Sequence, residues 1–136
     1  MLNSRINLTI RITQDGDHSQ TAYETDANFL EKDGKFYLFF DEQNDDGEIT
    51  KCRFEISDHT LRMRRNGPIV IEQNHVNKQE TFGYIKTPFG HVDTSIQTSH
   101  FSFKKQASET YYLELEYDLY TGAEKTGSYS LEIIIT

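Results

Sequence analysis

The fold is decided by residues 27–40, which read ANFLEKDGKFYLFF. Large apolar side chains occur on both sides of Asp33-Gly34, and an Asp-Gly pair between alternating runs is a strong hairpin signal. A two-residue turn at this pair sets Phe29 opposite Leu38. Residues 27–40 therefore predict two adjacent antiparallel strands with a defined register.

The same period of two recurs along the chain and predicts about ten short strands. We expect them near residues 5–12, 19–30, 35–41, 49–57, 60–66, 69–73, 79–87, 91–103, 110–120 and 131–135. Three further turn pairs, Asp15-Gly16, Asp46-Gly47 and Asn66-Gly67, can supply the positive φ angles of tight hairpins. Closure would remove the two exposed edges of such a sheet. The fold class we predict is all-β, a single closed or nearly closed antiparallel barrel of about 8–10 strands over residues 1–136.

The composition and net charge indicate which partners and which cellular compartment to expect. The chain has 136 residues, a formal net charge of −8 and one cysteine, Cys52. An acidic chain repels phosphate backbones, so we expect no nucleic-acid partner. One cysteine forms no intrachain disulfide, and residues 1–6 lack the pattern of a signal peptide. We expect a cytoplasmic protein without a membrane partner.

A family resemblance supports the same architecture. The segment GYIKTPFG at residues 83–90 resembles a signature of the YwiB-like family of uncharacterised bacterial proteins. Arg65-x-Gly67 upstream of this segment, and the alternating run over 113–117 and the closing run over 131–135 downstream of it, occur in an order similar to that of the family. The resemblance implies a calycin-like, lipocalin-like β-barrel and no established activity.

Hairpin register places one charged side chain on the apolar face. A turn at Asp58-His59 sets Cys52 opposite Arg65, so Arg65 points into the barrel and needs a partner there. That partner is either a protein carboxylate or carbonyl near the barrel end, or an acidic group of a bound ligand. Tyr23, Tyr117, Thr94 and Thr98 occupy plausible inward positions and would line the same lumen, although inward tyrosines also simply fill cores.

The opposite face offers an alternative function. The hairpin at 27–40 leaves Leu30, Tyr37 and Phe39 outside, either as a contact surface or covered by a neighbouring segment. Arg53 lies opposite Arg64, which is a like-charge pair that suits an acidic partner, an anion or a second copy of the chain. A solvated face is the simpler interpretation.

No catalytic or metal constellation emerges from the remaining residues. The acidic run over 41–48 has its glycine one place late for a calcium loop. The histidines fall in or near predicted turns, and His91-x-Asp93 lacks a visible third ligand. Cys52 points inward as a packed thiol, with Arg65 as the one neighbour that would lower its pKa. The sequence therefore favours a non-catalytic small-molecule binding module without cofactor or metal; a protein–protein interaction barrel with a filled core, or a homodimer, is the alternative.

Overall fold

A computed structural model describes residues 2–136, which form ten antiparallel strands. The strands are β1 (Leu2–Gln14), β2 (Asp17–Lys32), β3 (Lys35–Gln43), β4 (Ile49–Ile56), β5 (Thr60–Asn66), β6 (Val70–Val76), β7 (Glu80–Thr87), β8 (Gly90–Ala107), β9 (Thr110–Thr121) and β10 (Glu124–Ile135). Each strand pairs with its neighbours in sequence, and β1 also pairs with β10. The predicted all-β closed barrel is therefore confirmed.

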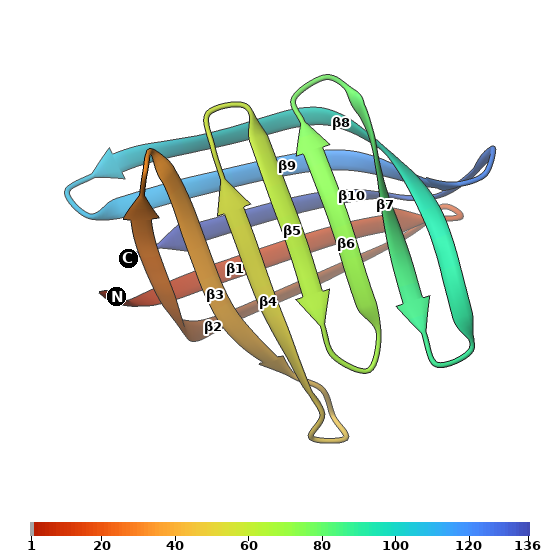
Figure 1. Cartoon of the computed structure of the whole chain (residues 1–136), viewed down its shortest axis with the longest axis horizontal. Coiled ribbons are helices and arrows are strands. Elements are labelled where there is room, and N and C mark those ends of the chain that lie inside the picture. The colour runs from red at the N-terminus through yellow and green to blue at the C-terminus, as the bar shows by residue number, and fades with distance from the viewer. Residues whose placement is uncertain (1) are drawn as a thin grey trace.

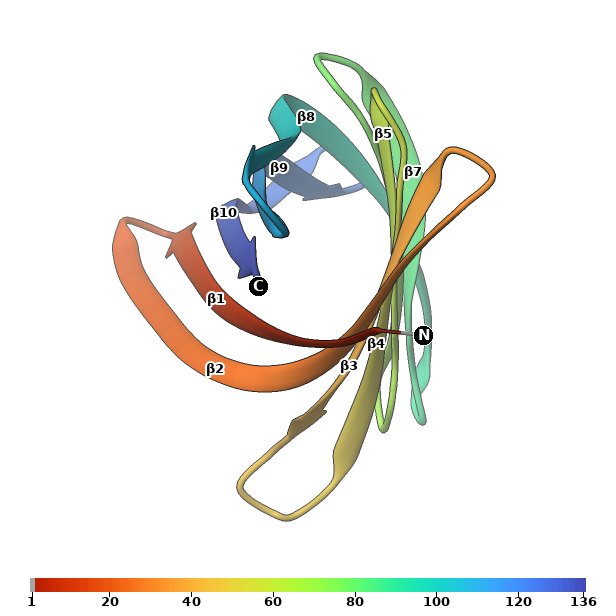
Figure 2. The same cartoon turned by 90° about the vertical axis from the view of Figure 1, so that its left-hand side faces the viewer.

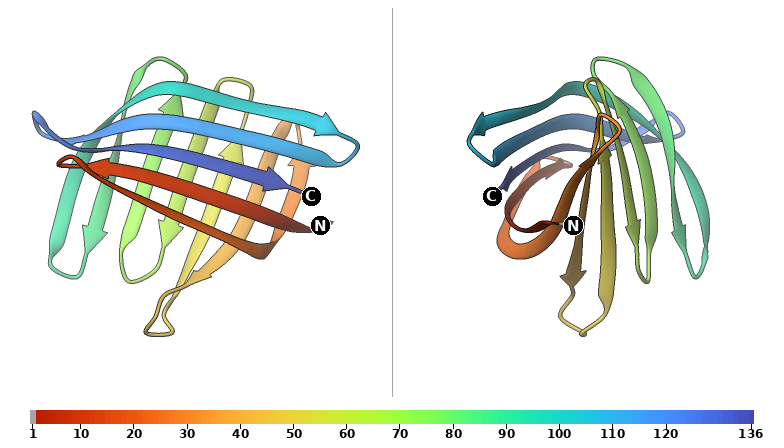
Figure 3. Two further views of the ribbon diagram at one scale, coloured as in Figure 1. Left: turned by 180° about the vertical axis from the view of Figure 1, so that it is seen from behind. Right: turned by 60° about the vertical axis from the view of Figure 1, so that its left-hand side comes forward.

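The barrel is flattened into two curved layers. Strands β3 to β7 lie side by side in front, whereas β8, β9, β10, β1 and β2 run across behind them (Figure 1). Figure 2 shows the two layers curving around a common interior. The view from behind follows β1 and β2 as a long ribbon until β2 bends to join the front layer (Figure 3). This bend positions the candidate site.

Two of the predicted turns have the geometry that the sequence requires. Asp15 and Gly16 have φ angles of 51° and 81°, and Asp33 and Gly34 have φ angles of 55° and 79°. Positive φ at both central residues matches the right-handed twist of the strands that flank a two-residue turn. The chain also turns after Asn66, but Gly67 has no positive φ, so the predicted backbone conformation of that glycine was wrong. An added Cβ at Gly67 would instead overlap Thr50 on the neighbouring strand.

The predicted hairpin registers are present in the structure. The pairs are Phe29–Leu38, Leu30–Tyr37, Cys52–Arg65, Arg53–Arg64 and Ile56–Leu61. A single-residue slip would have turned every side chain to the other face, so the separation of inside from outside follows from these pairs.

Alternate residues of nearly every strand fill the interior with apolar side chains. The inward face of β9 contributes Leu113, Leu115, Tyr117 and Leu119, all of which are buried. Phe29, Phe36, Phe103 and Tyr111 stack at one end, with ring centroids 5.0 to 6.4 Å apart. This aromatic cluster fills that end of the barrel.

Candidate functional site

The wall of the barrel opens between β2 and β3. Their pairing runs from Lys32–Lys35 to Asn28–Phe39 and then stops, while β2 continues along β1 and β3 continues along β4. The register that sets Phe29 opposite Leu38 also predicts Ala27 opposite Phe40, but this pair is absent from the ladder between these strands. The bend that carries β2 from one layer to the other separates the two strands beyond this point.

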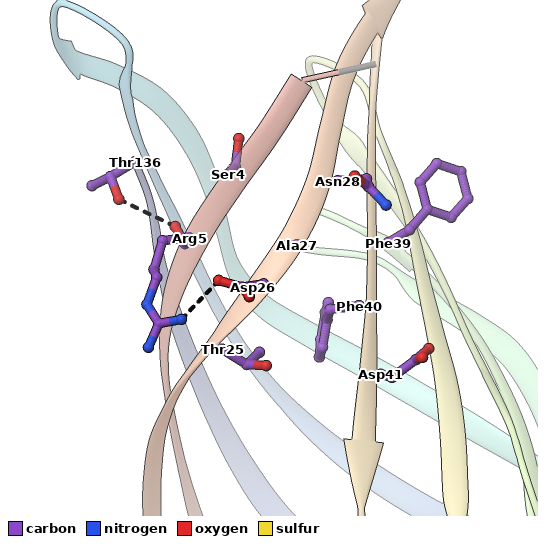
Figure 4. A pocket seen from close by; sticks show the side chains of 10 residues that line it. All are labelled: Ser4, Arg5, Thr25, Asp26, Ala27, Asn28, Phe39, Phe40, Asp41 and Thr136. Carbon is purple, nitrogen blue, oxygen red and sulfur yellow. Dashed lines mark hydrogen bonds and ion pairs between the residues drawn. The ribbon is translucent and has the colours of Figure 1, made fainter.

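Two adjoining clefts occupy this opening. The first has a volume of about 850 Å³ and the second about 650 Å³, and Thr25 and Asp41 line both. Figure 4 shows the first cleft, in which Asp26 accepts an ion-paired hydrogen bond of 2.7 Å from Arg5. The clefts thus reach from the outer surface to the inward face of the front layer.

Four strands bring a cluster of polar side chains to the second cleft. Glu42 on β3 accepts hydrogen bonds from Tyr23 on β2 and from Arg65 on β5. The Cys52 thiol on β4 lies 3.5 Å from the same carboxylate. The Arg65 side chain is 35% exposed and that of Glu42 is 19% exposed. Of the two partners that the sequence left open for Arg65, the structure supplies a protein carboxylate near the barrel end.

The environment of Glu42 keeps the neighbouring phenol and thiol protonated. Burial raises the pKa of Cys52 to about 12, and the charge of Glu42 adds to this effect while Arg65 opposes it. Burial and the hydrogen bond to Glu42 also raise the pKa of Tyr23 above its ordinary value. Arg65 does lower the pKa of Cys52, as the sequence predicts, but burial and the charge of Glu42 outweigh the guanidinium, so the net shift is upward.

Three of the predicted lumen residues lie elsewhere. Thr94, Thr98 and Tyr117 are on the inner face, but they are buried and line neither cleft. Only Tyr23 and Arg65 of the five predicted lumen residues share the open site.

The buried polar residues surround a histidine that sequence reasoning placed near a turn. His75 lies within β6 and is fully buried, with Nδ1 2.9 Å from the Thr98 hydroxyl and Nε2 3.0 Å from the Gln73 amide oxygen. Its ring centroid is 4.6 Å from that of Tyr117. Burial lowers the pKa of His75 to about 3, so the ring is neutral at ordinary pH. Continuing the alternation of Ile71 through β6 would have identified this inward position.

The two predicted outer surfaces form one surface. The Arg53 guanidinium lies 5.9 Å from the ring centre of Tyr37 and 5.6 Å from that of Phe39. Leu30 is half-buried beside Tyr37, and Arg64 stands opposite Arg53 on β5. We call Leu30, Tyr37, Phe39, Arg53 and Arg64 the outer patch.

Carboxylates outnumber cations around the two clefts. The charged residues that line them are Glu24, Asp26, Asp41, Glu42, Arg5 and Arg65. Four negative charges against two positive charges leave a local excess of negative charge. An opening of this sign attracts cations.

Neither a metal-binding cluster nor a membrane-spanning helix is found among the described residues. His91 and Asp93 lie 2.7 Å apart, but no group of three metal-ligating side chains gathers anywhere in residues 2–136. Across the same residues, no helix combines the length and the apolar character needed to cross a membrane.

Comparison with known proteins gives the family. A family described as "Domain of unknown function (DUF1934)" matches residues 6–133. The chain belongs to this family. It is 24% identical over 123 residues to the "Uncharacterized beta-barrel protein YwiB" of Bacillus subtilis (strain 168), covering 90% of this chain and 84% of the relative.

A solved structure of the family supports the fold. The crystal structure of the ywiB protein from Bacillus subtilis matches with a TM-score of 0.84 at 20% identity, over 98% of this chain and 89% of the other. The YwiB-like resemblance of the sequence is thus confirmed. The comparisons therefore show a β-barrel protein of this family.

Proposed function

We propose that this family member is a non-catalytic binding barrel that holds a small organic cation in the opening between β2 and β3. The observation that carries the proposal is the separation of these strands beyond Asn28–Phe39, which opens two clefts over a cluster of polar side chains. Small-molecule sites are concave and carry a few convergent polar groups. The cluster around Glu42 supplies such groups from four strands.

The sign of the charge favours a cation over the acidic ligand that Arg65 suggested. Glu42 already neutralises Arg65, so the guanidinium is not a free anion receptor. A carboxylate has about four acceptor positions, so Glu42 can accept from a ligand as well as from Tyr23 and Arg65. Asp41 is exposed, lines both clefts and adds a second carboxylate.

The same groups argue for binding rather than for nucleophilic catalysis. Cys52 is buried with a pKa raised to about 12, so little thiolate is present at neutral pH. His75 is sealed among Gln73, Thr98 and Tyr117, away from both clefts. Neither group is placed to attack a molecule in the opening.

The test uses spermidine as the cationic probe and citrate as the anionic one, at equal ionic strength. A ligand that binds only the folded state raises the melting temperature. We expect spermidine to stabilise the protein more than citrate does. Asp41→Asn should lose at least half of the spermidine shift, because it removes a carboxylate common to both clefts. Asp17→Asn, at an exposed position outside the clefts, is the matched control and should retain the shift.

Native mass spectrometry of protein purified gently from its own cells supplies the natural ligand. A stoichiometric excess mass that matches the formula of an organic amine would support the proposal. Equal stabilisation by spermidine and citrate, or equal losses in Asp41→Asn and Asp17→Asn, would remove the basis for a cation site.

A further inference from the structure

One row of outward side chains crosses the front layer next to the opening. Cross-strand pairing sets Phe39 beside Arg53, Arg53 beside Arg64, Arg64 beside Glu72 and Glu72 beside Tyr84. All five point outward from β3, β4, β5, β6 and β7, the layer that faces the viewer in Figure 1. The row therefore has an aromatic ring at each end and charged groups between them.

The middle of the row carries excess positive charge. Glu72 is ion-paired to Arg62 at 2.9 Å and to Arg64 at 3.0 Å, so one carboxylate serves two guanidiniums. Arg53 stacks over Tyr37 and Phe39, and within residues 2–136 it has no carboxylate within ion-pair distance. Like charges directly opposite on a sheet destabilise it unless a negative group compensates.

The row is also hollowed. One groove of about 320 Å³ includes Phe39, Asp41, Lys51, Arg53 and Arg64 in its lining, and a second of about 330 Å³ lies among Arg53, Glu55, Arg62 and Arg64. Phe39 and Asp41 also line the first cleft, so the groove begins at the edge of the opening. Across the two grooves four cations face two carboxylates. The two grooves share Arg53 and Arg64, so they are continuous across β4 and β5. Arginine and aromatic side chains are the residue types that dominate binding energy in protein interfaces.

We propose that this groove binds an extended acidic segment of a partner protein, with its carboxylates on Arg53 and Arg64 and apolar flanks on Phe39 and Tyr84. Four strand spacings separate β3 from β7, or about 19 Å, which an extended chain spans with about six residues. Recognition of acidic motifs by clustered arginines is an established binding mode.

Two other occupants fit the surface less well. The acidic stripe Glu114, Glu116 and Asp118 lies on β9 in the back layer, so a second copy would dock front to back. Such heterologous contacts propagate into rings or filaments rather than closing as a dimer. A nucleic acid would extend beyond the row and meet the field of a chain with a net charge of −8.

The test is an NMR titration of ¹⁵N-labelled protein with a short peptide whose central glutamates are flanked by leucine and phenylalanine. We expect the amide shifts to concentrate at Phe39, Arg53, Arg64 and Tyr84. The double variant Arg53→Gln/Arg64→Gln should weaken binding by about tenfold or more. Its melting temperature should change by no more than a few degrees, because relief of the like-charge pair offsets the loss of an exposed ion pair, and Arg62 still pairs with Glu72.

Arg11→Gln is the matched control, since Arg11 is an exposed arginine on the outer face of β1 in the back layer. It should leave the affinity unchanged. Equal binding of a peptide with glutamines in place of glutamates, or shifts centred on β9, would overturn the proposal. Tighter binding of an oligothymidylate of similar length would replace it with a nucleic-acid site. The spermidine shift should persist in the double variant, which separates this surface from the cation site.

Discussion

The neutral state of His75 predicts a loss of stability as the pH falls. The Thr98 hydroxyl donates to Nδ1, and Nε2 donates to the Gln73 amide oxygen, so both ring nitrogens are satisfied without a charge. Burial holds the pKa of the folded-state ring at about 3, whereas the ordinary value is 6.5. Between these two values only the unfolded chain binds the proton, so protonation favours unfolding.

The magnitude follows from the two pKa values. The contribution of the neutral His75 ring to the free energy of unfolding is fully present above the unfolded pKa of 6.5. Below that pH it falls by about 1.4 kcal/mol for each pH unit, until the ring in the folded protein titrates near 3. Integration between about pH 7 and about pH 5 gives a loss of about 2 kcal/mol from this one side chain.

The perturbation is His75→Gln, measured by urea unfolding at both pH values. The variant starts less stable because it disturbs a buried hydrogen-bond network, but it should lose about 2 kcal/mol less than the wild type on acidification. His59→Gln, at an exposed position in the β4–β5 turn, is the control and should lose as much stability between the two pH values as the wild type does. Parallel losses in the wild type and His75→Gln, within about 0.5 kcal/mol, would refute the assignment of a neutral buried ring.

Three further predictions concern reactivity and packing. Because the pKa of Cys52 is raised from 9.0 to about 12, its thiolate fraction falls about a thousandfold, and Ellman's reagent should label it only after unfolding. Labelling of the native protein at the rate of a free thiol would contradict this. Gly83→Ala sets a Cβ against the main-chain oxygen of Glu72 and should cost about 2–3 kcal/mol in urea unfolding; a cost near zero would show that the β6–β7 contact is loose. Leu115→Ala, at a fully buried position, should cost about 3–4 kcal/mol, whereas Ile134→Ala, 40% exposed, should cost less than about 1 kcal/mol. Similar costs at the two positions would mean that the assignment of inner and outer faces is wrong.

Local patterns predicted much of the barrel because hairpins depend on neighbouring residues. The Asp33-Gly34 turn and the alternation around it were enough to set the register of β2 against β3. The turns that contain Lys78 and Glu109 were harder to recognise, because both residues have positive φ without glycine or asparagine at that position. A positive φ is uncommon for such residues, so their sequence gives no turn signal.

The candidate site was predicted only in part. Register was sufficient to point Arg65 inward, but its partner Glu42 is 23 residues away and belongs to a strand that does not pair with β5. The pairing of β2 with β3 ends beyond Asn28–Phe39 because β2 bends there, and no turn residue in the sequence predicts this bend. The stacking of Arg53 on Tyr37 and Phe39 likewise required the spatial order of β3 and β4.

The fold class, the strand register and the apolar face of each hairpin could all be predicted from local sequence patterns. These properties follow from a period of two and from turn residues, both of which act over a few neighbouring positions. Three-dimensional packing sets where the wall opens, which carboxylate neutralises Arg65 and which polar side chains surround His75. Those outcomes depend on how the closed sheet bends to form two layers. Side chains that are distant in sequence meet only after the barrel has closed.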